Sequence, residues 1–363
     1  MKSTLRILHV IYALSGGGAE RQLHLLIKHA PPESTHAILC VDQRNADINE
    51  WPVELFVHQR RGKFDWGFFR TCRNCISQFN PDVIHVWLPP VISIPALVMA
   101  AIQGKPVVFS YRNLMRFRRA LDVVEYCAAL LCSTKVISNN LICQSSWAYR
   151  LLYHLKNGCT IPNGFDFSAL GNQIGPSVKS GDLFRLIFVG RLVEQKNILY
   201  LIRALALLPR KYNWQLNVYG EGSQKSDAIK IASEHGIIQN IVFHGFEPDI
   251  FSKIAESDLL VIPSVSEGMP NVLIEALSIK IPVVASSIPA ILDVVGDSES
   301  SILIDPSDPR NIADGIRMFM DNHGVYLKNA EKGFLVAKRY DARTMSIKYY
   351  DEYEKLNINH LLN

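Results

Sequence analysis

The chain has 363 residues, of which 48% are hydrophobic and 20% are charged, and its formal net charge is +4 at pH 7. This composition predicts a soluble globular protein with two domains, and the small net charge excludes general binding of nucleic acid. Seven scattered cysteines, an N-terminus without a signal-peptide pattern and the lack of a long apolar run predict a cytoplasmic protein without a transmembrane segment.

The first predicted strand, residues 5–11, ends in a glycine-rich loop. Gly16, Gly17 and Gly18 lie between this strand and an amphipathic helix that carries Leu23 and Leu26 on one face. Glycines let a ligand approach the main chain closely, so a strand, a glycine loop and a helix in this order are typical of a phosphate site. A tight turn without a ligand is the alternative, because the loop lacks the spacing of a dinucleotide-binding loop and the Lys-Ser/Thr of a P-loop.

Strands and helices continue to alternate through the first half of the chain. This alternation predicts a parallel sheet, in which ligands bind beyond the carboxyl ends of the strands. His85, Arg112 and Asn113 lie at such ends, and a buried His85 that hydrogen-bonds within the core is the alternative. Cys72 and Cys75 are expected on the buried face of their helix, because no second pair or His cluster accompanies them. The predicted strands cover 37–41, 83–87 and 106–110, and the helices cover 68–79 and 92–102.

Two groups of basic residues in the first half accompany aromatic or apolar residues. Such groups predict peripheral contact with the headgroups of an anionic membrane, and an ordinary solvated surface is the alternative. Arg60, Arg61 and Lys63 lie beside Phe64 and Trp66, whereas Arg112, Arg116, Arg118 and Arg119 precede the apolar stretch 123–131.

A polar, glycine-rich segment over 168–181 is typical of an interdomain linker and places the domain boundary near residue 170. The next strand, 183–189, leads into a loop that carries Arg191 and Lys196. Two cations on one loop can neutralise the charge that develops on a diphosphate leaving group without a metal, and surface salt bridges are the alternative. Further strands are predicted over 216–219, 241–243, 258–262, 283–285 and 302–304, and a last helix over 344–356.

The segment 264–277 is typical of a turn followed by a helix that begins near Pro270. Glu267 lies in the turn, and Glu275 lies in the helix, on the order of 8 Å along its axis. Carboxylates at this separation suit two hydroxyl-bearing parts of one extended ligand. The helix N-terminus between them can bind an anion, and a capped surface helix with a solvated Glu is the alternative. The amides expected to face the anion are those of Met269, Asn271 and Val272.

The pattern Ser-Glu-Gly-x-Pro-Asn-x-x-x-Glu-Ala, from Ser266 to Ala276, resembles the Glu-x7-Glu signature of retaining family-4 glycosyltransferases. The Gly-Gly-x-Glu-Arg loop at 17–21 and the Pro-Asn-Gly-Phe-Asp segment at 162–166 also resemble this family. The resemblance covers nearly the whole chain and implies the α/β GT-B fold, in which two Rossmann-like doubly wound domains face a central cleft. It implies an acceptor-binding domain over 1–170, a nucleotide-sugar-binding domain over 171–341 and a C-terminal helix, about 342–363, that returns to the first domain.

The resemblance also implies an activity. We expect a metal-independent, retaining glycosyltransferase that moves a hexosyl-type sugar from a UDP- or GDP-linked donor and uses no other cofactor. The implied acceptor is a hydroxyl of a lipid-linked or polysaccharide glycan in cell-surface synthesis, such as that of lipopolysaccharide or exopolysaccharide, at the inner face of the plasma membrane. The chain has no Asp-x-Asp motif for a metal. A GT-B nucleotide-sugar epimerase and a non-catalytic nucleotide-sugar-binding protein are the alternatives.

Most of the expected site residues take their roles from matching positions in the family. Glu267 is expected to bind hydroxyls of the donor sugar, Glu275 those of the ribose, and Arg191 with Lys196 the two phosphates. Arg112 stands where many relatives have a His and cannot act as a base at neutral pH, so contact with phosphate or acceptor is expected. Phe246 is expected near the base, with a core position as the alternative. The remaining expected residues are His85, as a catalytic residue, and Gly16, Gly17, Gly18, Asn113, Gly268, Met269, Pro270, Asn271 and Val272, as substrate-binding residues.

Overall fold

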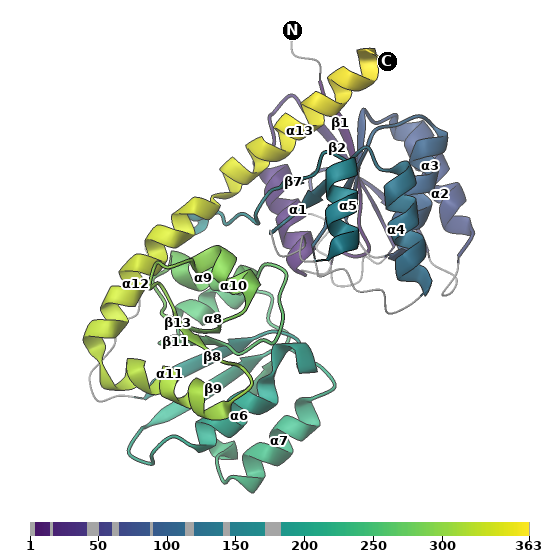
Figure 1. The fold of residues 1–363 in the computed structure, drawn as a ribbon. Helices are drawn as coiled ribbons and strands as arrows, with labels where there is room; N and C mark the ends of the chain where they lie inside the picture. The colour runs from purple at the N-terminus through teal and green to yellow at the C-terminus, as the bar shows by residue number, and fades with distance from the viewer. Residues whose placement is uncertain are drawn as a thin grey trace. The chain divides into compact units, whose positions relative to one another are not determined.

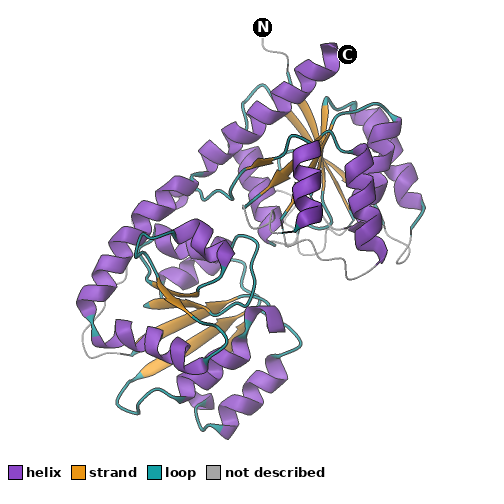
Figure 2. Ribbon diagram, in the orientation of Figure 1, coloured by secondary structure: helices purple, strands orange, loops and turns teal. Residues whose placement is uncertain are grey.

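A parallel β-sheet lies at the centre of each of two compact units (Figure 2). Unit 1 comprises Met1–Gly164 and Ala342–Asn363, and unit 2 comprises Phe165–Asp341. The chain thus divides after Gly164, ahead of the predicted boundary near residue 170, and its last helix belongs to unit 1. The computed structural model describes residues 4–14, 17–41, 51–59, 65–87, 90–112, 120–140, 146–170 and 183–362.

The sheet of unit 1 has seven strands among the described residues, in the order β3-β2-β1-β4-β5-β6-β7, and neighbouring strands are parallel. The order runs outward from β1 in both directions, which is the arrangement of a doubly wound α/β domain. The strands are β1 (Arg6–Val10), β2 (Thr35–Cys40), β3 (Glu54–Val57), β4 (Val83–Val86), β5 (Val107–Tyr111), β6 (Lys135–Ser138) and β7 (Cys159–Thr160).

Helices cover both faces of this sheet (Figure 1). Successive strand residues point to opposite faces, so Leu8 and Val10 pack in one core while Ile7 and Ile11 pack in the other. The first core lies under α2 (Gly67–Phe79), α3 (Pro90–Ile102), α4 (Ala120–Cys132) and α5 (Trp147–Leu155). The second lies under α1 (Gly18–Lys28) and α13 (Ala342–Leu362), which pack against each other.

Unit 2 repeats this architecture with a parallel sheet that has six strands among the described residues, in the order β10-β9-β8-β11-β12-β13. Its order reverses between β8 and β11, so the loops that leave these two strands emerge side by side, where ligands bind in open α/β sheets. The strands are β8 (Phe184–Val189), β9 (Trp214–Tyr219), β10 (Ile241–Gly245), β11 (Leu259–Ile262), β12 (Val283–Ser286) and β13 (Ile302–Ile304).

Two cores also flank the sheet of unit 2. One involves α6 (Ile198–Ala206), α7 (Lys225–Glu234) and α11 (Pro309–Asp321), and the other involves α8 (Ile250–Ala255), α9 (Asn271–Ser278) and α10 (Pro289–Val295). Helix α12 (His323–Ala337) contributes to both cores. Short 3₁₀ turns cover Phe167–Leu170, Glu194–Lys196, Ile238–Asn240 and Lys338–Tyr340.

The structure confirms the predicted fold class of two Rossmann-like α/β domains. The predicted strands and helices are present with shifts of a few residues, and Cys72 and Cys75 are buried on α2 as expected. The short strand β3 was not predicted, because only its four residues and no long apolar run mark it in the sequence.

The residue just after the C-cap of helix α9 has a backbone conformation that is unusual for a residue with a side chain. Lys280 follows the C-cap Ile279 and has a φ of 61°, in the left-handed region that favours glycine. The backbone N–H groups of Lys280 and Ile281 donate to the carbonyl oxygens of Leu277 and Ala276, at 3.2 and 2.9 Å. Lys280 Nζ also forms an ion pair of 2.7 Å with Glu331 Oε1 on α12, but Glu331 is largely exposed, so the pair adds little.

We predict that the Lys280→Gly variant is more stable than the Lys280→Ala variant by about 1 kcal/mol, because alanine keeps the cost of a left-handed backbone and glycine removes it. Both variants lose the ion pair with Glu331, so the comparison isolates the backbone term. Urea denaturation of the two variants measures the difference. Equal stability of the two would show that this backbone conformation carries no cost.

Candidate functional site

Hydrogen bonds join the loop that follows β8 to the loop that follows β11. The backbone N–H of Val265 donates to the Gln195 carbonyl at 3.0 Å, and Gln195 Nε2 donates to the Ser266 carbonyl at 2.8 Å. Buried Asn197 donates through Nδ2 to the carbonyls of Pro263 and Pro306, at 3.0 and 2.8 Å. The segment around Lys196 and the segment around Glu267 are therefore held in fixed register.

An ion pair connects two residues that the sequence analysis selected independently. Lys196 Nζ lies 2.6 Å from Glu267 Oε1, and the two side chains are 19% and 7% exposed. The aliphatic part of Lys196 passes over Gly190, with its methylene carbons about 3.4 Å from where a Cβ atom would lie. Arg191 is exposed on the same loop. The cationic loop and the first carboxylate of the motif thus meet at the carboxyl edge of the sheet.

The helix that follows this turn is buried along nearly its whole length. Pro270 is the N-cap of α9, as predicted, and its carbonyl accepts from the Leu273 N–H at 3.1 Å. Glu267 and Glu275 are both buried, so the alternative of a surface helix with a solvated Glu is wrong. Gly268, Met269, Asn271 and Glu275 all have interaction partners within the chain. The motif therefore places two carboxylates in a protein environment where each needs a polar partner.

The loops after β8, β9 and β10 are joined by main-chain hydrogen bonds. Gly220 N–H donates to the Gly245 carbonyl at 2.6 Å, and Gly190 N–H donates to the Tyr219 carbonyl at 2.9 Å. Gly220 has a φ of 133°, and a Cβ atom there would lie 2.1 Å from the Gly190 carbonyl oxygen. Only glycine fits this position, which explains the glycine directly after β9.

The loop between β10 and α8 presents Phe246 to solvent. Phe246 is 63% exposed, so the core alternative for it is wrong. The N-cap Asp249 fixes the loop: its carboxylate accepts from Ser252 N–H and Oγ at 3.3 and 2.6 Å, and its own N–H donates to Glu247 Oε1 at 3.0 Å.

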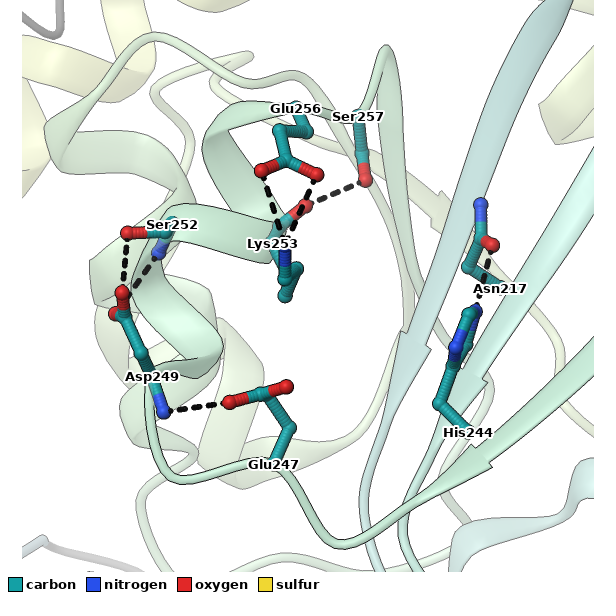
Figure 3. Close-up of polar contacts among 8 residues, drawn as sticks. All are labelled: Asn217, His244, Glu247, Asp249, Ser252, Lys253, Glu256 and Ser257. Atoms are coloured by element: carbon teal, nitrogen blue, oxygen red, sulfur yellow. Dashed lines mark hydrogen bonds and ion pairs between the residues drawn. The ribbon is translucent and has the colours of Figure 1, made fainter.

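Next to this loop, His244 stacks on Tyr219 at 4.4 Å between ring centroids. His244 Nε2 also lies 2.9 Å from Asn217 Oδ1, so two polar side chains on neighbouring strands hold each other (Figure 3). The sequence analysis missed this pair. Asn217 and Tyr219 are two positions apart on one strand and therefore lie on the same face of the sheet, and this spacing is the signal that could have indicated the pair.

In unit 1, the loop at the corresponding edge of the sheet places Gly17 next to the carboxylate of Glu20. Gly17 is the N-cap of α1, and Glu20 Oε2 lies 2.3 Å from where a Cβ atom at Gly17 would be. Burial raises the pKa of the Glu20 carboxyl group, and the nearby Arg112 and backbone amides lower it in part. Gly17 and Gly18 are exposed. A side chain at Gly17 would therefore displace only the flexible end of Glu20, so the steric constraint on this glycine is weak.

Arg112 is buried at the end of β5. Its guanidinium lies over the Trp87 ring, 4.8 Å from the centroid, and donates to Asn163 Oδ1. Arg112 therefore belongs neither to the predicted membrane-contacting basic group nor to the solvated surface that is its alternative. Asn163 and Trp87, which sequence reasoning missed, are its internal partners.

Profiles of known families match this chain over most of its length. The profile described as "Glycosyl transferases group 1" matches residues 172–342, and that described as "Glycosyltransferase Family 4" matches residues 16–169.

The chain belongs to the group 1, family-4 glycosyltransferases.

Individual relatives of this glycosyltransferase agree with that assignment. It is 33% identical over 151 residues, 40% of this chain and 39% of the relative, to an uncharacterized glycosyltransferase of Methanocaldococcus jannaschii. It is 21% identical over 300 residues, 78% of this chain and 82% of the relative, to the capsular polysaccharide biosynthesis glycosyltransferase CapH of Staphylococcus aureus. Several curated relatives are matched over less than half of their own length.

A solved structure shows the fold. The crystal structure of Anabaena Alr3699/HepE in complex with UDP-glucose superposes on this glycosyltransferase with a TM-score of 0.82. The sequence identity is 20%, and the match covers 97% of this chain and 100% of that one. The fold is therefore GT-B.

The structure corrects the expectation for His85. The side chain of His85 is fully buried, with Nδ1 2.6 Å from the Tyr353 hydroxyl on α13 and Nε2 2.6 Å from Ser110 Oγ. Both ring nitrogens are engaged in the core of the glycosyltransferase, as the alternative proposed. We therefore assign His85 to the core and leave it out of the proposed site.

Two further buried histidines, His9 and His36, form a hydrogen-bonded chain that ends on α13. Trp87 Nε1 can only donate, and its partner is His9 Nδ1 at 3.3 Å, so His9 carries its proton on Nε2. His9 then donates to His36 Nδ1 at 3.0 Å, and His36 donates through Nε2 to the Tyr350 hydroxyl. Tyr350 in turn lies 2.9 Å from Ser34 Oγ. This chain of hydrogen bonds is complete only when both histidines are neutral.

Protonation of either histidine would set a donor against a donor in this chain. Burial lowers the pKa of His36 to about 4, from an ordinary value of 6.5, and lowers that of His9 as well. The unfolded protein takes up protons below pH 6.5 that the folded protein cannot, so stability falls as the pH drops from about 6.5 toward 4.

We predict that unit 1 loses on the order of 1–3 kcal/mol of stability between pH 7 and pH 4.5, and that His36→Gln reduces this pH dependence. Urea denaturation at several pH values measures both. The matched control is His235→Gln, which replaces an exposed histidine of unit 2 and should keep the wild-type pH dependence. An unchanged pH dependence in His36→Gln would contradict the assignment of neutral, coupled histidines.

Some expected site residues lie outside the described residues, namely Gly16, Asn113, Arg60, Arg61, Lys63, Phe64, Arg116, Arg118 and Arg119. Among the residues that the structure does describe, no group of His, Cys, Asp and Glu is arranged to hold a metal ion. No helix within the same described ranges combines the length and the apolar character needed to cross a bilayer.

Proposed function

We propose that this glycosyltransferase moves a sugar from a UDP- or GDP-linked donor to a hydroxyl of a glycan or lipid-linked acceptor, with retention at the anomeric carbon. The ion pair between Lys196 and Glu267 at the start of α9 carries the proposal, because it brings a cation and a carboxylate together at the switch point of the sheet of unit 2. Unit 2 is the proposed donor-binding unit, and unit 1 the proposed acceptor-binding unit.

The proposed donor contacts follow from the chemistry of each side chain. The Lys196 ammonium has three donors, of which one points to Glu267, so it can also bind oxygens of a diphosphate. Arg191, exposed on the same loop, supplies a second cation, and these two charges neutralise the leaving group without a metal. Glu267 accepts from hydroxyls of the donor sugar, and Glu275 accepts from the ribose hydroxyls. The segment Gly268–Val272 surrounds the phosphates, and Phe246 lies against the base.

The proposed transfer needs no enzyme nucleophile. The bond between the anomeric carbon and the phosphate oxygen breaks while the acceptor oxygen bonds to the same face of the sugar. The acceptor proton passes to an oxygen of the departing diphosphate. The charge that develops on that diphosphate is what Lys196 and Arg191 stabilise, so their contribution is largest in the transition state.

The acceptor proposal draws on relatives and on unit 1. CapH of Staphylococcus aureus is named for capsular polysaccharide biosynthesis, which supports a cell-surface glycan acceptor here. Such an acceptor would place the enzyme on the cytoplasmic side of the plasma membrane. Gly17 and Gly18 are exposed at the sheet edge and are the proposed acceptor contacts, whereas Arg112 is proposed to position Trp87 and Asn163.

The test of this function is incubation of the enzyme with UDP- and GDP-sugars, with and without membrane-extracted glycolipids and polysaccharide fragments. The proposal expects a new glycosidic product with the anomeric configuration of the donor, as read by NMR. A changed sugar in the donor-only reaction would instead identify an epimerase. Donor binding without turnover on any acceptor would indicate a nucleotide-sugar-binding protein.

We predict that Lys196→Ala and Glu267→Ala each lower turnover by about 100-fold or more, because each removes a preorganised charge from the transition state. Steady-state rates with the preferred donor measure the loss. Lys230→Ala is the matched control, since Lys230 is exposed and its pairing with Glu234 spans 3.9 Å. Wild-type turnover in either site variant would remove the ion pair from the mechanism.

Each single variant also leaves the other member of the pair without its counter-charge, which lowers stability most when buried Glu267 is the one left. The double variant Lys196→Met with Glu267→Gln removes both charges and should regain stability while its turnover stays low. Recovery of activity together with stability would show that the pair acts only on folding.

We predict that the correct nucleotide sugar raises the melting temperature and that Glu275→Gln weakens this effect. A ligand at 100 times its dissociation constant adds about 2.7 kcal/mol to stability. Loss of one charged hydrogen bond to the ribose lowers affinity by roughly 10-fold or more. A thermal-shift series over UDP- and GDP-sugars measures the stabilisation of the wild type and of Glu275→Gln. Equal shifts for the two proteins would count against the ribose contact.

A further inference from the structure

Helix α5 of unit 1 is apolar on both its inner and its outer side. Ala148, Tyr149 and Leu152 are buried in the core. The outer side carries residues at the spacing i, i+3, i+4, i+7 and i+8, which share one helix face. These residues are Trp147 (69% exposed), Arg150, Leu151 (43%), His154 and Leu155 (59%). Three large apolar side chains thus alternate with two basic ones in a stripe that faces solvent.

Helix α4 packs beside α5 (Figure 1). Its exposed residues are Ala120, Val123, Val124, Cys127 and Leu131, again on one helix face. Val123 and Val124 are about half exposed, and Leu131 is 79% exposed. We call these five residues and the five of the α5 stripe the α4–α5 face. Single exposed apolar residues are common on proteins, but six large ones on two neighbouring helices form a patch that marks a contact surface.

The charge around the α4–α5 face has one sign. The acidic residues of the described helices α2 to α5 are Asp122, which is half-buried, and Glu125, which is buried and accepts from Ser93 Oγ. Burial raises the pKa of Glu125 to about 7. Among the Arg, Lys, His, Asp and Glu residues of these helices, those that are exposed are all basic: Arg70 and Arg73 on α2, and Arg150 and His154 on α5.

This combination selects one kind of partner. Trp favours the boundary between headgroups and acyl chains, leucine and valine favour the acyl region, and arginine meets the phosphate groups. A protein partner would favour an apolar patch with its charges at the rim, whereas here Arg150 and His154 lie between Trp147 and Leu155. These described helices expose no acidic side chain that would repel an anionic lipid surface, and their exposed basic side chains attract one.

We propose that the α4–α5 face docks unit 1 on an anionic lipid bilayer, reversibly and without insertion of a helix across it. The stretch 123–131, for which the sequence analysis expected contact with lipid, supplies four of the five outer residues of α4, and α5 is the part that sequence reasoning missed. The face lies on the helical layer of the sheet, apart from Gly17 and Arg112 at the strand ends. The proposal does not depend on the proposed transfer reaction, since docking can be measured without donor or acceptor.

The experiment is co-sedimentation of the full chain with vesicles of phosphatidylcholine alone or mixed equally with phosphatidylglycerol. We expect binding to the mixed vesicles that weakens at high salt, as screening of charge requires. The variant Leu151→Glu with Leu155→Glu should bind the mixed vesicles at least about 10-fold more weakly, since buried charges in the interface oppose insertion. Trp147→Phe should reduce the blue shift of tryptophan fluorescence on vesicle addition.

The matched control is Leu327→Glu with Leu335→Glu, two leucines of α12 in unit 2 that are 53% and 62% exposed. This control should bind the mixed vesicles as the wild type does. Donor binding, read by thermal shift, should be the same in all variants, which separates this proposal from the transfer reaction. The proposal is overturned if the wild type does not bind the mixed vesicles, or if the α5 variant binds them as well as the wild type. If the wild type does not bind vesicles, and the Leu151→Glu with Leu155→Glu variant differs from it in oligomeric state, the face would be a protein interface instead.

Discussion

The contact between Lys196 and Glu267 is the interaction on which the proposed donor site depends. Glu267 is nearly fully buried, and an unpaired carboxylate there would cost several kcal/mol, so the lysine is needed to hold the turn before α9 in place. The turn fixes the start of α9, and α9 in turn carries Glu275 into its buried position. The hydrogen bonds of Gln195 and Asn197 hold the two loops in register around this pair. One pair of charges therefore links the cationic loop, the helix start and the second carboxylate.

Unit 1 is organised by a different constraint, the docking of its last helix. Three tyrosines of α13 are buried against the sheet, and Tyr350 and Tyr353 end hydrogen-bond networks that begin at His9, His36 and His85. Every ring nitrogen of these histidines is engaged inside the protein. The polar groups beneath α13 thus specify its position, while the apolar residues around them supply the burial. Gly17 and Arg112 lie at the edge of the same sheet against which α13 packs.

Local patterns predicted most of the fold, because parallel strands form apolar runs and the turns after them carry glycine and polar residues. The motif from Ser266 to Ala276 indicated both carboxylates and the helix start at Pro270, since cap and turn preferences are local. Patterns could not show which polar residues were in the core. The partner of His85 on α13 is 268 positions away in sequence, and Arg112 finds Asn163 at a separation of 51. Lys280, which has a left-handed backbone where glycine is favoured, and the exposed side of α5 likewise depend on tertiary packing.

The central claim is that a nucleotide sugar is held at the start of α9 by Lys196 and by the two carboxylates of the motif. A crystal structure of the complex with UDP-glucose or with the nucleotide sugar preferred in solution tests it most directly. The account predicts an oxygen of the diphosphate about 3 Å from Lys196 Nζ, hydroxyls of the transferred sugar on Glu267 and those of the ribose on Glu275. A nucleotide sugar bound elsewhere, with Lys196 and both carboxylates free of contact with it, would contradict the account.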